Sequence, residues 1–279
     1  SRIIILKMVC AYLLNSIILK EDTAVKMDAG IVPTVLKGNL MELKDKAIFC
    51  WSGGKDSAFG LYKILQEAKY DVLYLLTTIN DDYKRVSMHG VREEMLDKQI
   101  ESIGIPALKV RVIDGTYDEY ERLMHSVLMR AKSEGITHVI FGDIFLEDLR
   151  SYREDNLKKV DLIGVFPLWK SDTSILINEF LDHKFRTITC CISDVHLDQS
   201  WVGQEITTSF IAALPEQVDP CGENGEYHTF CFDGPLFKKT IDFVLGEQVY
   251  KPIQLKNDDE EILETTQTNG FWFCDILPI

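Results

Sequence analysis

The residues best suited to chemistry lie in one short segment that combines small, hydroxyl and charged side chains. They are Ser52, Gly53, Gly54, Lys55, Asp56 and Ser57. The segment stands between an apolar run typical of a β-strand and apolar residues at helical spacing. Paired glycines let the backbone turn its N–H groups toward an anion, and the start of a helix adds positive partial charge. Because Lys55 adds a mobile cation, the segment predicts a loop that binds phosphate.

The spacing within this segment indicates which phosphate chemistry to expect. It does not fit the P-loop pattern G-x-x-x-x-G-K-[ST], because Lys55 directly follows the glycine pair. It resembles the S-G-G-x-D-S signature of the ATP pyrophosphatase, or PP-loop, enzymes. That resemblance implies ATP cleavage between the α- and β-phosphates, with AMP left on a substrate oxygen and Mg²⁺ offsetting the developing charge. A plain strand-to-helix turn capped by Asp56 or Ser57 is the alternative.

Three more candidate residues are expected at the same edge of the fold. His89 follows the second expected strand, and Gly142 and Asp143 end the fourth. Ligands of open α/β sheets bind outside the carboxyl ends of the strands. His89 is therefore a candidate contact for the nucleotide or a substrate acid, and Asp143 a candidate ribose or Mg²⁺ partner beside Asp56. Helix capping or an ordinary surface position is the alternative for His89 and Asp143.

Charged residues farther along the chain are the candidates for holding a substrate. Arg150 and Arg153 share one helical face and can bind a carboxylate or phosphate, although solvated salt bridges explain them equally well. A loop at residues 222–229 is dense in glycine and acidic residues. Its candidate substrate contacts are Glu223, Asn224, Gly225, Glu226, His228 and Thr229. Glu226 or His228 is the expected base for an incoming ammonium ion, and both join Lys55 and Asp56 in the expected catalytic set. A glycine-rich β-turn is the alternative.

The elements expected to position these residues alternate along the chain. Apolar runs at residues 47–51, 72–78, 107–113 and 137–141 predict strands, with helical stripes between them. Such alternation predicts an α/β fold, a Rossmann-like parallel sheet covered by helices. The weaker patterns that follow predict a second, smaller α/β domain. They are an apolar turn at 165–169, a helix at 172–183, a strand at 186–192, helical residues at 204–214, a loop at 218–234 too polar for the core, and a strand near 240–245.

We accordingly divide the chain into four parts. Residues 1–40 are expected to be an N-terminal extension outside the native fold, because Met41 opens the segment that leads into the first convincing strand. Residues 41–165 form the predicted ATP-binding domain and residues 166–255 the predicted substrate-binding domain. Residues 256–279 are expected to be an acidic C-terminal tail, because acidic residues crowd positions 258–261.

Composition limits the classes of function. The chain has 279 residues, of which 46% are hydrophobic and 27% charged, and its formal net charge is −14. That charge provides no basic field to hold nucleic acid by counterion release. The seven cysteines include no C-x-x-C pair, which argues against a disulfide framework or a zinc ribbon. We find no good signal peptide or membrane span and expect a cytoplasmic protein, with a homodimer left open.

The motifs together resemble those of one family over residues 46–245. Besides the phosphate loop, the resemblance rests on residues 142–153, 167–169, 197–203, 222–229 and 235–237. In this order they are similar to the diphthine–ammonia ligase family, a PP-loop group with an N-terminal ATP domain and a C-terminal substrate domain. The resemblance implies a ligase that uses ATP and Mg²⁺ to adenylate a carboxylate, small or protein-borne, and couples it to ammonia or an amine.

The loop at residues 222–229 departs from the pattern E-G-G-E-[FY]-E-[TS] of the diphthamide enzymes. Asn224 stands where the pattern has Gly, and His228 where it has Glu. The loop is similar instead to a bacterial branch proposed to act in cobinamide salvage. Replacing a fixed anion by a group that titrates near neutrality is expected to change which substrate is held. Two other hypotheses stay open, sulfur transfer to RNA through Cys221 and ATP binding without turnover.

Overall fold

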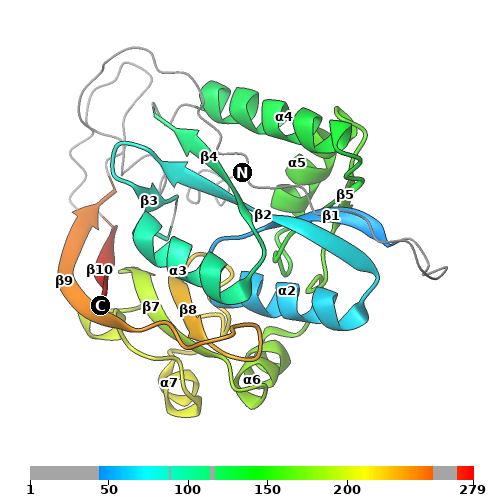
Figure 1. The fold of residues 1–279 in the computed structure, drawn as a ribbon. Helices are drawn as coiled ribbons and strands as arrows, with labels where there is room; N and C mark the ends of the chain where they lie inside the picture. Colours follow the sequence, from blue (N-terminus) through cyan, green and yellow to red (C-terminus); the bar gives the residue numbers. More distant parts are fainter. Residues whose placement is uncertain (1–43, 88, 114–116, 254–268) are drawn as a thin grey trace.

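The computed structural model describes residues 44–87, 89–113, 117–253 and 269–279, which form two β-sheets and the helices around them (Figure 1). The first sheet, sheet A, has six strands. They are β1 (Asp45–Cys50), β2 (Tyr70–Asn80), β3 (Arg85–Val86), β4 (Ala107–Val112), β5 (His138–Ile140) and β6 (Ile163–Val165). The second, sheet B, has four. They are β7 (Arg186–Ser193), β8 (Tyr227–Asp233), β9 (Phe243–Pro252) and β10 (Gly270–Pro278).

Sheet A is mostly parallel, as the alternating pattern predicted. Its strand order is β3-β2-β1-β5-β6 with β4 also beside β2, and only the short pairing of β2 with β3 is antiparallel. β1 lies at the centre, and Ala47, Ile48 and Phe49 are fully buried, as expected of a parallel strand covered on both faces. The α/β class with a separate smaller sheet is confirmed.

Helices cover both faces of sheet A. The α-helices of the described residues are α2 (Lys55–Glu67), α3 (Glu93–Ile103), α4 (Tyr117–Ser133), α5 (Glu147–Lys158), α6 (Thr173–Asp182) and α7 (Thr208–Ala213), of which α6 and α7 lie beside sheet B (Figure 1). Figure 1 shows α4 and α5 on one face and α2 and α3 on the other, between sheet A and sheet B. Successive residues of β1 reflect this arrangement, because Ile48 packs in the cluster that includes α4 while Phe49 packs with α2.

The helix α2 connects the two sheets. Its Phe59 ring lies 6.0 Å from the ring of Phe180 in α6 and 5.8 Å from that of Phe185, which precedes β7. A single buried cluster therefore runs from sheet A through α2 to sheet B. This packing sets the N-terminus of α2 against β8, far away in sequence.

Three stretches of the second half differ from the sequence-based expectation. β6 pairs with β5 where only an apolar turn was expected, because three residues are too few to show periodicity. The helical residues expected at 204–214 reduce to α7. The prediction that 218–234 is a loop too polar for the core is wrong for β8, in which Tyr227 and Phe230 are buried. The polar composition of residues 218–226 concealed the strand that follows.

The expected C-terminal tail does not hold for Gly270–Pro278. These residues form β10, which lies between β7 and β9 in an antiparallel sheet, and Phe271 and Ile276 are each only 1% exposed. The expectation followed the acidic residues at 258–261, which lie outside the described residues, as does the expected extension 1–40. The last predicted strand, near 240–245, is β9 and begins later.

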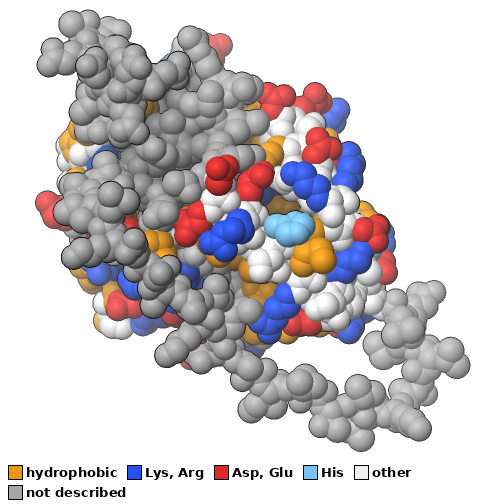
Figure 2. Space-filling view, turned by 90° about the horizontal axis from the view of Figure 1, so that it is seen from above, with side chains coloured by type: hydrophobic (Ala, Val, Ile, Leu, Met, Phe, Trp, Pro, Cys, Tyr) orange, Lys and Arg blue, Asp and Glu red, His pale blue; other side chains and the backbone are white. Residues whose placement is uncertain are grey.

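The described surface carries both signs of charge. On the face seen in Figure 2, Lys and Arg side chains are interspersed with Asp and Glu. The part of that face which the structure describes has no continuous basic patch. Among the described helices, none has the length and apolar character needed to cross a membrane.

Candidate functional site

The predicted phosphate loop turns sharply between β1 and α2. Gly53 has a φ of +83°, in the left-handed region that glycine adopts without strain. A Cβ atom at this position would lie 2.7 Å from Gln99 Oε1. A Cβ atom at Gly54 would lie 2.7 Å from His89 Cε1. The first glycine is thus required by its backbone conformation, and both are required by the close approach of neighbouring side chains.

Hydroxyl groups surround the N-terminus of α2. The Oγ atoms of Ser52 and Ser57 lie 3.1 Å apart, and Ser57 Oγ donates to the Gly54 carbonyl at 2.9 Å. From β8, Thr229 Oγ1 accepts a hydrogen bond from Lys55 N at 2.9 Å. These groups lie where a helix terminus carries positive partial charge, so the arrangement suits an anion.

Gln99 on α3 holds this loop in place, and sequence reasoning missed it. The side chain is 1% exposed, and its Nε2 donates to the carbonyls of Gly53 at 2.9 Å and Cys231 at 2.7 Å. Its Oε1 accepts from Trp51 Nε1 at 3.2 Å. The signal that could have identified it is a glutamine on the apolar stripe of a helix, because a buried amide needs hydrogen-bond partners.

Two histidines meet beside Gly54. His89 Nδ1 lies 3.0 Å from the Thr229 carbonyl, and because a carbonyl only accepts, Nδ1 carries the proton. The ring of His89 lies 4.9 Å from that of His228, with an angle of 45° between the planes. The loop at 222–229 and the segment after β3 therefore converge on the phosphate loop, which brings the predicted nucleotide and substrate residues together.

Lys55 turns its ammonium group into the protein. The residue is 3% exposed, and Nζ lies 2.8 and 2.7 Å from the two carboxylate oxygens of Asp56. Nζ also donates to the Cys221 carbonyl and lies 5.5 Å from the centroid of the Tyr227 ring. Burial acts to lower the pKa of Lys55, but several neighbouring groups, the Asp56 carboxylate first among them, together raise that pKa above its ordinary value.

The acidic loop between α7 and β8 is folded around its own carboxylates. Asp219 Oδ1 accepts from the backbone N–H of Cys221 and Glu223, at 2.9 and 3.2 Å. Glu226 Oε1 accepts from Asp219 N at 3.0 Å and from Asn224 Nδ2 at 3.1 Å. Glu226 is 7% exposed, and its Oε2 has no hydrogen-bond partner among the described residues. A buried carboxylate oxygen left in this way is unusual and suits a ligand that the protein has yet to bind.

Glu223 connects the acidic loop to the end of sheet A. Its Oε1 accepts from Ile144 N at 3.2 Å, directly after the predicted residues Gly142 and Asp143. A Cβ atom at Gly142 would lie 3.1 Å from the Asp56 carbonyl, so the end of β5 and the start of α2 approach each other closely. Gly225, with a φ of +92°, makes the turn within the loop.

Asp143 and Arg153 form an ion pair. Arg153 Nε lies 2.7 Å from Asp143 Oδ2, too poorly aligned for a hydrogen bond, and Nη2 donates to Oδ1 at 3.2 Å. The guanidinium also stacks 4.4 Å from the centroid of Phe141. Burial acts to lower the pKa of Arg153, but the Asp143 carboxylate raises it overall. In this structure Asp143, the predicted metal ligand, and Arg153, the predicted substrate contact, are thus engaged with each other.

Arg150 contacts a residue of its own helix and the segment that follows β6. It forms an ion pair with Glu154 at 2.7 Å, and its guanidinium stacks 4.6 Å from the rings of both Phe166 and Trp169. The sequence analysis allowed two roles for Arg150, a substrate contact and a salt bridge, and the structure shows the salt bridge. A contact with substrate stays a prediction.

Comparison with known proteins assigns the two halves of this site to two matched domains. The family model described as the diphthamide synthase N-terminal domain matches residues 45–162, and that of the diphthamide synthase C-terminal domain matches residues 172–257. The phosphate loop lies in the first and the acidic loop in the second. The two domains therefore meet at the contact between Lys55 and Thr229.

Three relatives illustrate the resemblance. The diphthine–ammonia ligase of Danio rerio is 27% identical over 217 residues, covering 68% of this chain and 83% of its own length. The diphthine–ammonia ligase of Mus musculus is 27% identical over 218 residues, covering 68% of this chain and 79% of its own length. A tRNA-cytidine(32) 2-sulfurtransferase of Neisseria meningitidis is 35% identical over 119 residues, covering 37% of this chain and 36% of its own length. The ligases thus match along most of their length and the sulfurtransferase over about a third.

Proposed function

Because this chain belongs to the diphthamide synthase family, we propose that it is an ATP-dependent ligase that adenylates an acceptor carboxylate and joins it to ammonia. The observation that carries the proposal is the contact of the phosphate loop with the second matched domain, where Thr229 Oγ1 on β8 accepts from Lys55 N at 2.9 Å. Nucleotide and acceptor would react at one place, as a two-step transfer through a reactive intermediate requires.

The chemistry runs in two steps. An oxygen of the acceptor carboxylate attacks the α-phosphorus of ATP, the bond from that phosphorus to the bridging oxygen breaks, and pyrophosphate leaves. Ammonium loses a proton to a base of the site, the lone pair of the resulting ammonia attacks the acyl carbon, and the bond from carbon to the AMP oxygen breaks. The nitrogen loses a proton to a base, for which the unpartnered Oε2 of Glu226 is the first candidate and His228 the second.

Mg²⁺ would reach this site with the nucleotide. Within the described ranges no cluster of three or more His, Cys, Asp or Glu side chains is arranged to hold a metal. Magnesium in nucleotide sites needs only one or two carboxylates besides the phosphate oxygens, and Asp56 at the start of α2 fits that part. Asp143 would join it after release from Arg153. When bound, the ion offsets the charge on the departing pyrophosphate.

The acceptor is proposed to differ from the diphthine that gives the two ligases described above their name. His228 stands beside His89 at the junction of the two domains, where the diphthamide pattern carries a carboxylate. A neutral or positively charged imidazole favours an acceptor with different charge near its carboxylate, such as the acids of cobinamide salvage. His228→Glu would then shift activity toward a diphthine-bearing elongation factor.

Product analysis with Mg-ATP, ammonium chloride and a panel of carboxylic acids tests the proposal. The panel includes cobinamide-type acids and a diphthine-bearing elongation factor, and Lys55→Ala serves as the inactive control. We expect AMP and pyrophosphate that depend on one acceptor and are lost in the variant. Formation of ADP and phosphate would overturn the α–β cleavage, and tight ATP binding without turnover would favour a nucleotide sensor.

Sulfur transfer to RNA is the alternative raised by the sulfurtransferase match. Its reactive thiol would be Cys221, which is 2% exposed. Burial raises the pKa of that thiol, so it stays protonated and a poor nucleophile at neutral pH. The site therefore favours the ligase, and a filter-binding assay with tRNA at low salt would detect an RNA partner.

A further inference from the structure

The buried ammonium group of Lys55 lies in a site with the chemistry of a cation receptor. Two carboxylate oxygens of Asp56 lie 2.8 and 2.7 Å from Nζ, the Cys221 carbonyl accepts from it, and the Tyr227 ring centroid lies 5.5 Å away. A carboxylate, a carbonyl and an aromatic face are the groups that recognise alkylammonium ions. Because the residue is 3% exposed, these groups replace water around the charge.

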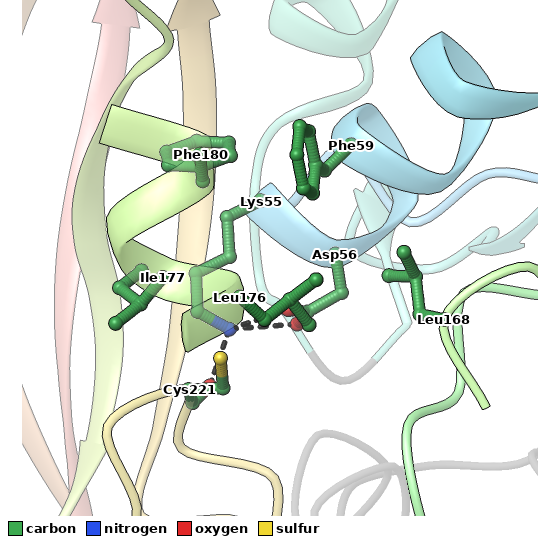
Figure 3. A pocket seen from close by; sticks show the side chains of 8 residues that line it. All are labelled: Lys55, Asp56, Phe59, Leu168, Leu176, Ile177, Phe180 and Cys221. Atoms are coloured by element: carbon green, nitrogen blue, oxygen red, sulfur yellow. Dashed lines mark hydrogen bonds and ion pairs between the residues drawn. The ribbon is translucent and has the colours of Figure 1, made fainter. Parts of the chain in front are cut away.

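A small recess opens beside this ammonium group. Figure 3 shows Lys55 and Asp56 reaching it from α2 and apolar side chains facing it from α6, with Cys221 closing one end. Its lining residues are Lys55, Asp56, Phe59, Leu168, Leu176, Ile177, Phe180 and Cys221. The recess has a volume of about 10 Å³, near the roughly 10–15 Å³ that one water molecule needs. Ammonium and ammonia are molecules of that size.

The same ammonium group is the mobile cation that the phosphate loop needs. Its four-carbon stem lets it point either to the phosphates or into the protein, but not both ways at once. When ATP draws it away, the carboxylate, carbonyl and ring are left without their cation. The group that can replace it is a small cation with several N–H donors.

We propose that Asp56, the Cys221 carbonyl and the Tyr227 ring bind the substrate ammonium ion, and that Lys55 occupies this site until ATP arrives. The proposal rests on the ligase function proposed above. A carboxylate has two oxygens, so Asp56 can serve the ammonium ion with one and a metal with the other. Filling of the site by Lys55 makes ammonium binding depend on prior binding of ATP.

Thermal unfolding of Lys55→Ala in matched chloride salts, without ATP or acceptor, tests the site directly. Removing the lysine side chain leaves the receptor groups without their cation. We expect ammonium chloride at ten times its Kd to raise the Tm by about 3–5 °C over sodium chloride. Methylammonium should act similarly, because it reproduces the end of the lysine side chain. Lys55→Met, which refills the space with an uncharged chain, should show no such rise.

Variants of the ring separate the cation site from a general salt effect. Adding Tyr227→Leu to Lys55→Ala should abolish the ammonium effect, whereas adding Tyr227→Phe, which keeps the aromatic face, should preserve it. An equal rise with potassium chloride would make this a site for any monovalent cation and overturn the ammonium assignment. Equal responses to sodium and ammonium would overturn the site itself.

The unmodified chain provides a second measurement that does not depend on the folding of Lys55→Ala. Ammonium should raise its Tm over sodium only when Mg-ATP is present, and equal responses with and without the nucleotide would contradict the role of Lys55. No acceptor is present, so the result is independent of turnover. Selective ammonium binding without AMP formation on any acceptor would support the ammonium site and overturn the ligase function. AMP formation that depends on an acceptor, without selective ammonium binding, would support the ligase function and overturn the ammonium site.

Discussion

Gln99 shows how much one buried side chain contributes to the phosphate loop. Replacing it by leucine leaves the Cys231 carbonyl and Trp51 Nε1 without their partners, at about 1–3 kcal/mol for each buried polar group. We expect Gln99→Leu to lower the free energy of unfolding in urea by about 2–4 kcal/mol and to weaken ATP binding. Glu94→Leu, exposed on the same helix, is the matched control and should change stability by less than about 0.5 kcal/mol. Similar losses in both variants would refute the role of Gln99.

At the scale of elements, ion pairs of Asp275 join β10 to β3 and to the start of α3. The carboxylate lies 2.9 Å from Arg85 Nη1 and 2.7 Å from Arg92 Nη2. Burial acts to raise the pKa of Asp275, but its hydrogen bonds to these arginines lower it to about 2. Because the folded-state pKa lies below the unfolded value near 3.9, the stabilisation is complete above pH 4 and lost as pH falls toward 2.

Asp275→Asn should therefore cost stability at neutral pH and progressively less in acid. We expect a loss of about 1–2 kcal/mol at pH 7, a figure reduced for solvent screening because the carboxylate is partly exposed. Urea unfolding from pH 7 to pH 3 measures the difference. Glu247→Gln on β9 controls for the loss of one exposed negative charge. If the unmodified chain and Asp275→Asn differ in free energy of unfolding by the same amount at every pH from 7 to 3, the ion pairs are not the cause of the difference.

At the scale of the whole molecule, the largest buried cluster of the described residues spans both sheets, and Phe59 belongs to it. Its ring packs against Phe180 and Phe185, so the cluster that stabilises α2 also stabilises sheet B. Phe59→Ala should lower the free energy of unfolding by about 3–5 kcal/mol. Circular dichroism and tryptophan fluorescence should report one coincident urea transition in the unmodified chain. Two separate transitions would mean that the domains fold independently.

The sequence determined the parts whose cause is local. Alternating apolar runs specify β1 and α2, and the spacing of Gly53, Gly54 and Lys55 specifies the loop between them, because strand, turn and helix each depend on neighbouring residues. The same short-range patterns identified the family. They also placed the loop at 222–229 among the substrate candidates before any contact was known.

Tertiary structure alone decided what depends on partners distant in the chain. The contact of Thr229 with Lys55, the burial of Gln99 and the pairing of Asp143 with Arg153 join residues whose sequence neighbours give no sign of one another. The sequence led us to predict an acidic tail for the residues of β10, because a strand that completes a distant sheet carries no local signal of its partners. The contact of the Lys55 ammonium group with the Cys221 carbonyl likewise depends on the acidic loop, which is distant in the chain.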